Sequence, residues 1–118
     1  MNYNLQKLEE WYKSISSEKE LKLEEAQMLY QKIMTTTNEV TKKELQDEMI
    51  LGTLHVVYRL LKTSYLPYFP NGMIDVDDVI SVASELWIEF VLSGELLNIS
   101  FYNRLVPKLS TRNFKIIN

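Results

Sequence analysis

The chain has 118 residues, of which 46% are hydrophobic and 25% charged, and such a length and composition are typical of one ordinary globular domain. Its net charge of -3 argues against a protein that coats nucleic acid over its whole surface, but not against a local basic face. There are no cysteines, which excludes disulfides, thiolate zinc sites and a cysteine nucleophile. Three glycines and three prolines are too few for the many turns of an all-β or Rossmann fold.

The N-terminal stretch MNYNLQKLEEWYK is polar and charged and lacks the apolar block of a signal peptide. No apolar run approaches the roughly 18 residues that a membrane span needs. We therefore expect a cytoplasmic protein without a membrane partner. The first 66 residues contain one glycine and no proline, which predicts helices rather than strands. The whole pattern predicts an all-α single domain of four to five helices.

Two capping-box patterns predict helix starts in this region. Ser17 with Glu20 is the first, and Thr41 with Glu44 is the second, with Val40 and Leu45 at the positions of a hydrophobic staple. Between the two caps an apolar stripe of helical spacing indicates one buried helix face; its members are Leu21, Ala26, Leu29, Tyr30, Ile33 and Met34.

The helix that is predicted to start at the Thr41 cap has the more regular pattern from Leu45 onward. Its apolar residues step by four, three and four, which places them on one face: Ile50, Leu54, Val57 and Leu61. Gly52 inside it costs about 1 kcal/mol relative to alanine, so we expect a close contact at that position. The helix should end near Tyr65, because the residue before Pro67 is disfavoured in the α region, and residues 67–72 read as a loop.

Three carboxylates open the following segment, which we expect to form a helix over residues 75–91. If Asp75 is the N-cap, Asp77 and Asp78 lie in the first turn at the positive end of the helix dipole. A calcium loop needs a longer array with a central glycine and a late glutamate, so capping is preferred to a metal site. Ile74 and Val79 occupy the staple positions. An apolar face follows, and Ser93-Gly94 ends the helix; the face comprises Val79, Ile80, Ala83, Trp87, Phe90 and Val91.

No enzymatic chemistry is visible in the sequence. His55 is the single histidine and shares a polar helix face with Arg59 and Lys62, so we interpret it as an ordinary surface residue. The scattered glycines form no phosphate-binding loop, and no metal or cofactor is implied. The aromatic residues at helical positions are interpreted as packing residues; they are Trp11, Tyr12, Tyr30 and Tyr58.

From Leu96 onward the chain has no acidic residue. Its cations are spaced four, four and three apart, interrupted by Pro107; they are Arg104, Lys108, Arg112 and Lys115. Three aromatic residues, Phe101, Tyr102 and Phe114, are interleaved with them, and this mixture is used by single-stranded nucleic-acid binders. A solvated basic tail is the alternative. We divide the chain into a helical core, residues 1–95, and a basic C-terminal segment, residues 96–118, within or beside the same domain.

Two segments in register carry a family resemblance. MILGTLHVVYRLLK, residues 49–62, resembles the "LI..NLRLVV.IAK" helix of bacterial sigma-70 family factors. GMIDVDDVI, residues 72–80, is similar to the "GL.LEDLIQEG" segment that follows it in that family. With the capped helix from Leu21 to Met34, the resemblance covers about two thirds of the chain, residues 21 to 91.

The resemblance implies a sigma-factor region-2-like helical domain that binds the clamp coiled coil of core RNA polymerase. Carried over by position, the polymerase-binding residues are Asp78, Ser81, Val82 and Glu85. Ser81 stands where the family has glutamine, and Glu85 stands where an apolar residue is usual. Promoter DNA and an anti-sigma or co-regulatory protein are further implied partners. The implied DNA-binding residues are Phe101, Tyr102, Arg104, Lys108 and Arg112, in a segment that lacks the family's paired tryptophans.

Two functions follow as hypotheses. The first is a transcription-initiation or regulatory protein that binds core RNA polymerase through the 75–91 helix and has its basic C-terminus near DNA. The second is a small helical protein-interaction module that contacts neither polymerase nor DNA. Packing of the C-terminal segment back onto the core, with Arg104 and Lys108 paired internally, would favour the second.

Overall fold

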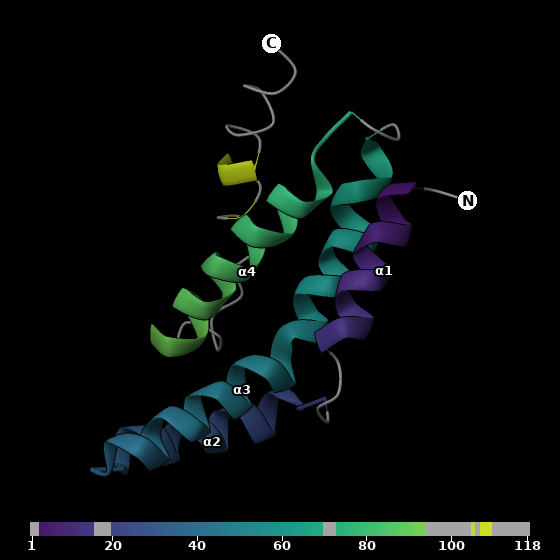
Figure 1. Cartoon of the computed structure of the whole chain (residues 1–118). Helices are drawn as coiled ribbons and strands as arrows, with labels where there is room; N and C mark the ends of the chain where they lie inside the picture. Colours follow the sequence, from purple (N-terminus) through teal and green to yellow (C-terminus); the bar gives the residue numbers. More distant parts are fainter. Residues whose placement is uncertain (1–2, 16–19, 70–72, 94–104, 106, 110–118) are drawn as a thin grey trace.

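Helices account for all the regular structure in the described residues, which are 3–15, 20–69, 73–93, 105 and 107–109 of a computed structural model. The longer ones are α1 (Tyr3–Ile15), α2 (Leu23–Thr35), α3 (Glu39–Leu60) and α4 (Val76–Ser93) (Figure 1). Their buried apolar side chains form one core, so the all-α, single-domain prediction is confirmed. Within these residues no helix has the length and apolar character to cross a membrane.

The starts of α2 and α3 differ from the predicted caps. Asn38 caps α3, since its Oδ1 accepts hydrogen bonds from the backbone N–H of Val40 (3.0 Å) and of Thr41 (3.1 Å). The Thr41 cap is therefore wrong, and Val40 is exposed rather than part of a staple. At the start of α2, Glu25 accepts from the N–H of Lys22 at 3.1 Å. The predicted cap at Ser17 lies outside the described residues.

The predicted stripe of α2 is confirmed at its centre and wrong at its ends. Ala26, Leu29 and Ile33 are buried against the core, whereas Met34 is exposed. Leu21 precedes the helix instead of belonging to it, and it packs half-buried beside α3. Only these three residues of α2 are buried, and they lie on one face, as expected for a helix that packs mainly on one neighbour.

Helix α3 and the turn after it end near Tyr65, as the sequence predicts. The end involves a change of helix type, which the sequence does not predict. Regular α3 stops at Leu60 and continues as a π-helical turn, Leu61–Tyr65, in which the N–H of Leu66 donates to the carbonyl of Leu61. A short 3-10 turn, Leu66–Tyr68, contains Pro67. Proline has no N–H to continue the helical ladder, so the wider turn precedes it.

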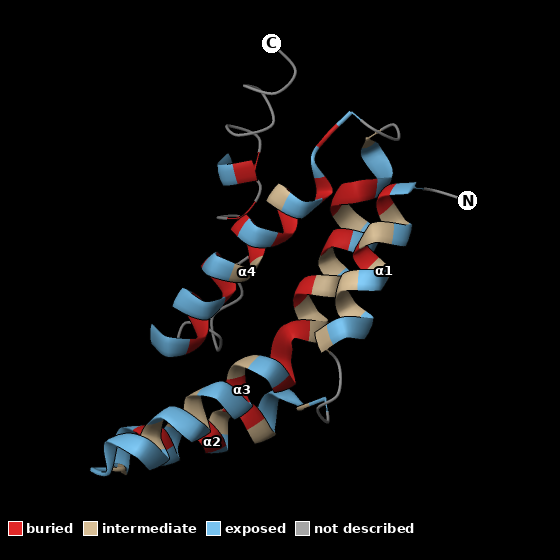
Figure 2. Ribbon diagram, in the orientation of Figure 1, coloured by how far each residue is buried: buried red, intermediate tan, exposed pale blue. Residues whose placement is uncertain are grey.

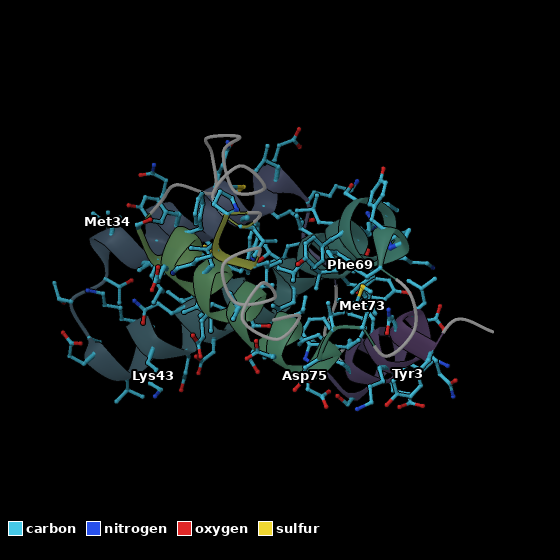
Figure 3. All side chains as sticks on the ribbon, turned by 90° about the horizontal axis from the view of Figure 1, so that it is seen from above. Tyr3, Met34, Lys43, Phe69, Met73 and Asp75 are labelled. Carbon is cyan, nitrogen blue, oxygen red and sulfur yellow. The ribbon has the colours of Figure 1, made fainter. Side chains whose placement is uncertain are left out.

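The helices form two regions, which we call the arm and the body. The arm consists of α2 and the Glu39–Leu51 part of α3, and the body of α1, the rest of α3, α4 and the described residues after α4. In Figure 1, α3 runs along α2 at one end of the molecule and along α1 at the other, where α4 faces it. Principal dimensions of 48 × 26 × 22 Å reflect the projection of the arm. Figure 3 shows Met34 and Lys43 at the arm end, far from Tyr3 and Phe69.

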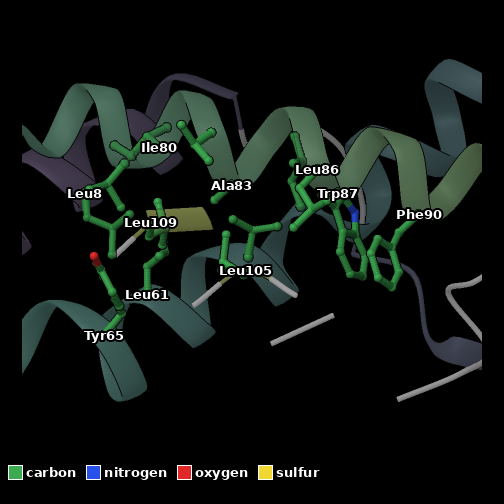
Figure 4. Close-up of a cluster of buried hydrophobic side chains, with 14 of the residues drawn as sticks. Leu8, Leu61, Tyr65, Ile80, Ala83, Leu86, Trp87, Phe90, Leu105 and Leu109 are labelled. Atoms are coloured by element: carbon green, nitrogen blue, oxygen red, sulfur yellow. The ribbon is translucent and has the colours of Figure 1, made fainter. Parts of the chain in front are cut away.

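The body core includes two leucines from the predicted C-terminal segment. Leu105 and Leu109 are fully buried and lie between α4 and the end of α3, near Leu61 and Tyr65 (Figure 4). The described part of residues 96–118 therefore packs within the same domain as the helical core.

The predicted packing role of the aromatic residues is confirmed. Trp11, Tyr30 and Tyr58 are partly buried against the core. Tyr12 stacks on Tyr58 with ring centroids 4.3 Å apart and an interplanar angle of 11°.

Candidate protein-docking surface on α4

The N-terminus of α4 is built by Asp75, as the sequence predicts. The Oδ1 atom of Asp75 accepts from the N–H of Asp78 at 3.2 Å, and its carbonyl accepts from the N–H of Val79 at 3.1 Å. Ile74 and Val79, the predicted staple residues, are both buried in the core. The carboxylates of Asp77 and Asp78 follow in the first turn, where the helix dipole stabilises negative charge.

One side of α4 is apolar and buried, and the helix packs against α1 and α3. All six residues of the predicted apolar face are buried, and three more join them: Val76, Val82 and Leu86. Figure 2 shows this buried side along the whole helix. The strip is wider than one face because Leu105 and Leu109 join α1 and α3 in covering α4.

The opposite side of α4 is exposed and acidic. Ser81 and Glu85 are exposed and Asp78 is half-buried, and their spacing of three and four residues places them in one line along the helix. Ile88 and Leu92, 37% and 43% exposed, continue that line. Between Val76 and Ser93 there is no lysine or arginine. This outward line, Asp78, Ser81, Glu85, Ile88 and Leu92, is referred to below as the α4 face.

Val82 does not belong to the α4 face. Its side chain is 7% exposed and lies in the core, so its expected place among the polymerase-binding residues is corrected here. Val82 lies about 100° from Ser81 around the axis, next to Val79 and Leu86, and the buried side of α4 extends to it. The structure brings the other three expected residues together on one surface.

A cation from α1 contacts the first turn of α4. Lys7 Nζ lies 2.9 Å from Asp77 Oδ2. The hydrogen bond to this carboxylate and its charge raise the pKa of Lys7. Asp77 is exposed, and the contact fixes the start of α4 to α1 without covering Ser81 or Glu85. The described residues contain no group of three or more histidine, cysteine, aspartate or glutamate side chains that could hold a metal ion.

His55 is not the surface histidine that the sequence suggests. It is half-buried, and its Nε2 lies 3.1 Å from the carbonyl oxygen of Leu21. A carbonyl only accepts, so Nε2 carries the proton in this contact. Its Nδ1 is buried and has no hydrogen-bond partner among the described residues. Sequence spacing missed this contact because it comes from a residue 34 positions away.

A cavity of about 360 Å³ lies beside His55, between the start of α2 and α3. Its walls include Leu23, Ala26 and Val56, and Lys22 and Arg59 also line it. Arg59 also donates to Glu20 at 3.2 Å. The one sequence signal for this region is Gly52, where an added Cβ would meet Leu21 side-chain atoms at 2.5 Å, so the expected close contact is confirmed.

Of the expected DNA-binding residues, the structure describes Lys108 alone. Lys108 is exposed on a helical piece whose neighbours Leu105 and Leu109 are buried. Phe101, Tyr102, Arg104 and Arg112 lie outside the described residues. The described piece is therefore amphipathic, with its cation directed outward.

Comparisons with protein-family models, with curated proteins and with solved structures found no match.

Proposed function

We propose that this chain is a sigma-factor-like transcription-initiation or regulatory protein that binds core RNA polymerase through the α4 face. One observation carries the proposal: Ser81 and Glu85, with the half-buried Asp78, form a line on α4 opposite its buried side. These are three of the four positions to which the sigma-70 resemblance assigns polymerase contact. A helix that buries one face in the core and exposes the other to solvent is suited to docking against a partner helix.

The charge of α4 supports a basic partner. The helix carries Asp77, Asp78, Glu85 and Glu89 and no lysine or arginine, and of these carboxylates Asp77 is paired with Lys7 of α1. Complementary charge of this kind raises the association rate and defines the partner's orientation more than it adds affinity. Ile88 and Leu92 add exposed apolar area at the far end of the α4 face, where desolvation contributes to affinity.

The proposal places the protein in the cytoplasm and includes promoter DNA and an anti-sigma or co-regulatory protein as partners. The DNA contact would be made by the C-terminal segment, through Phe101, Tyr102, Arg104, Lys108 and Arg112. The outward position of Lys108 supports this part. A phosphate contact of this kind is lost progressively as salt rises.

Co-elution with core RNA polymerase in gel filtration tests the proposal, with two charge reversals compared. Glu85→Lys changes the α4 face, and Glu44→Lys makes the same change at an exposed position of the arm. We expect the wild type and Glu44→Lys to co-elute with polymerase and Glu85→Lys to lose at least tenfold in affinity. Equal binding of the two variants would remove the α4 face from the interface.

A second function, a helical protein-interaction module without polymerase or DNA contact, is favoured by one observation. Leu105 and Leu109 pack into the core, so the C-terminal segment is at least partly structural. In that case no co-elution with polymerase occurs at any salt concentration, and promoter DNA is not bound. Binding of polymerase without promoter-dependent transcription would instead identify a regulator.

A further inference from the structure

Helix α3 changes direction between the arm and the body. Figure 1 shows its first part following α2 and its second part following α1 at a different inclination. In Figure 2 the change coincides with a continuous buried stretch, and in α3 the one run of three buried residues is Gly52, Thr53 and Leu54. The bend therefore lies at Gly52–Thr53.

The chemistry of these two residues accounts for a bend. Thr53 Oγ1 donates to the carbonyl of Met49 at 2.7 Å, a back-bond within the helix that tends to bend it. The carbonyl of Gly52 accepts from the N–H of Leu21 at 2.8 Å. A donor from outside α3 therefore binds a carbonyl that belongs to the hydrogen-bond ladder of the helix. Glycine adds backbone freedom at the same place.

Helix α4 contacts the bend directly. Trp87 Nε1 donates to Thr53 Oγ1 at 2.9 Å, and both side chains are buried. The Thr53 hydroxyl thus accepts from α4 while it donates to the turn of α3 that belongs to the arm. Since a buried donor left without a partner is costly, the position of Trp87 and the geometry of the bend constrain each other.

The other side of the bend is held by backbone contacts and has free space next to it. Leu21 donates through its N–H to Gly52 and accepts at its carbonyl from His55. The cavity of about 360 Å³ lies between these hydrogen bonds of Leu21 and helix α2. Space of that size next to the start of α2 leaves room for the arm to move, whereas the α4 side is filled by the Trp87 ring.

We propose that Gly52–Thr53 is a hinge between arm and body, and that α4 sets the angle of the arm through the Trp87–Thr53 hydrogen bond. A partner that displaces α4 by a fraction of an ångström at Trp87 then changes the arm's direction. The hinge is a property of the chain alone and does not depend on which partner occupies the α4 face. The proposed hinge thereby links the α4 face to the direction of the arm.

Distance measurements between two spin labels test the hinge. The chain has no cysteine, so Thr37→Cys at the arm tip and Gln6→Cys in α1 give unique labelling sites in the full chain. A swing of about 10° moves the tip by roughly 3 Å, since the 13 residues before the hinge span about 20 Å of helix. We expect Thr53→Val and Trp87→Phe to shift or broaden the distance distribution by at least this amount.

Two variants serve as controls. Thr63→Val removes the same kind of back-bond, to Arg59 at 2.7 Å, at an exposed position, and should leave the distribution unchanged. Thr53→Ser keeps both hydrogen bonds and should behave as the wild type. If Thr53→Val does not fold, Trp87→Phe decides, because it keeps a six-membered aromatic ring at this position and removes the N–H donor together with the five-membered ring of the indole. A folded Trp87→Phe protein with the wild-type distribution would overturn the hinge.

Discussion

The arm and the body are built from similar helices but differ in how much they bury. Helix α4 buries nine of its 18 residues, whereas α2 buries three of 13 and the Glu39–Leu51 part of α3 buries Met49 alone. Most helical stability in a folded protein comes from tertiary packing and little from intrinsic propensity. We therefore expect opening of the body to require the full free energy of global unfolding and local opening of the arm to require less free energy.

The largest expected difference is between buried side chains of the two regions. Phe90→Ala, at 1% exposure in the body core, should lower the free energy of unfolding by about 3–5 kcal/mol. Ile33→Ala in the arm should fall near the lower end of the range of about 2–5 kcal/mol, because α2 packs mainly on α3. Denaturant unfolding of both variants measures this. An Ile33→Ala cost equal to that of Phe90→Ala would contradict the comparison.

The junction of the two regions is tested by Gly52→Ala. An added Cβ meets Leu21 Cγ and Cδ1 at 2.5 Å, and overpacking costs about 1–3 kcal/mol, against about 1 kcal/mol gained in helix propensity. We expect net destabilisation in the wild-type background. In a Leu21→Ala background the same change should stabilise by up to about 1 kcal/mol. The sign reversal in a double-mutant cycle is the measurement, and an equal effect in both backgrounds argues against the contact.

Removal of the helix caps tests the difference between the arm and the body with a smaller loss of stability. Asn38→Ala and Asp75→Ala each remove a side-chain cap worth about 1 kcal/mol, one in the arm and one in the body. Amide hydrogen exchange should show Asn38→Ala lowering protection in the arm alone. Asp75→Ala should lower the protection of α3 and α4 together. Global loss of protection in Asn38→Ala would mean that the arm and the body unfold as one unit.

The smallest expected effect is a pH dependence in the body. Burial raises the pKa of Tyr12 to about 12, and the hydrogen bond that its hydroxyl donates to Glu20 at 2.9 Å adds to the shift. The unfolded chain ionises Tyr12 near pH 10, so the folded state binds more protons between about pH 10 and 12 and loses stability over that range. Tyr12→Phe should lessen this alkaline loss, with melting temperatures at pH 9 and 11 as the readout. An unchanged loss would exclude Tyr12 as its source.

The sequence predicted local features well where one pattern had no competitor. The cap at Asp75, the apolar side of α4 and the close contact at Gly52 all follow from residue type and spacing, and the structure confirms them. At α3 the sequence predicted the cap at Thr41, but the side chain of Asn38, three residues earlier, accepts from the backbone N–H groups of Val40 and Thr41. The boundary was therefore predicted three residues too late.

The errors at the site come from segments distant in sequence. Val82 is buried because α4 is covered on more than one side, by α1, α3 and the leucines at 105 and 109, which no helical period of α4 reveals. His55 was placed on a polar face, but Leu21 covers it from the connection between α1 and α2. Spacing within a helix predicts which residues share a side, and only the tertiary structure shows how many sides are covered.

The measurement that tests the central claim most directly is site-specific crosslinking of the α4 face to core RNA polymerase. Since the chain has no cysteine, Ser81→Cys and Glu44→Cys each carry a single photoreactive label, one on the α4 face and one on the arm. We predict that the label at position 81 crosslinks to a large polymerase subunit and that the label at position 44 does not. A crosslink from position 44 with none from position 81 would contradict docking through α4.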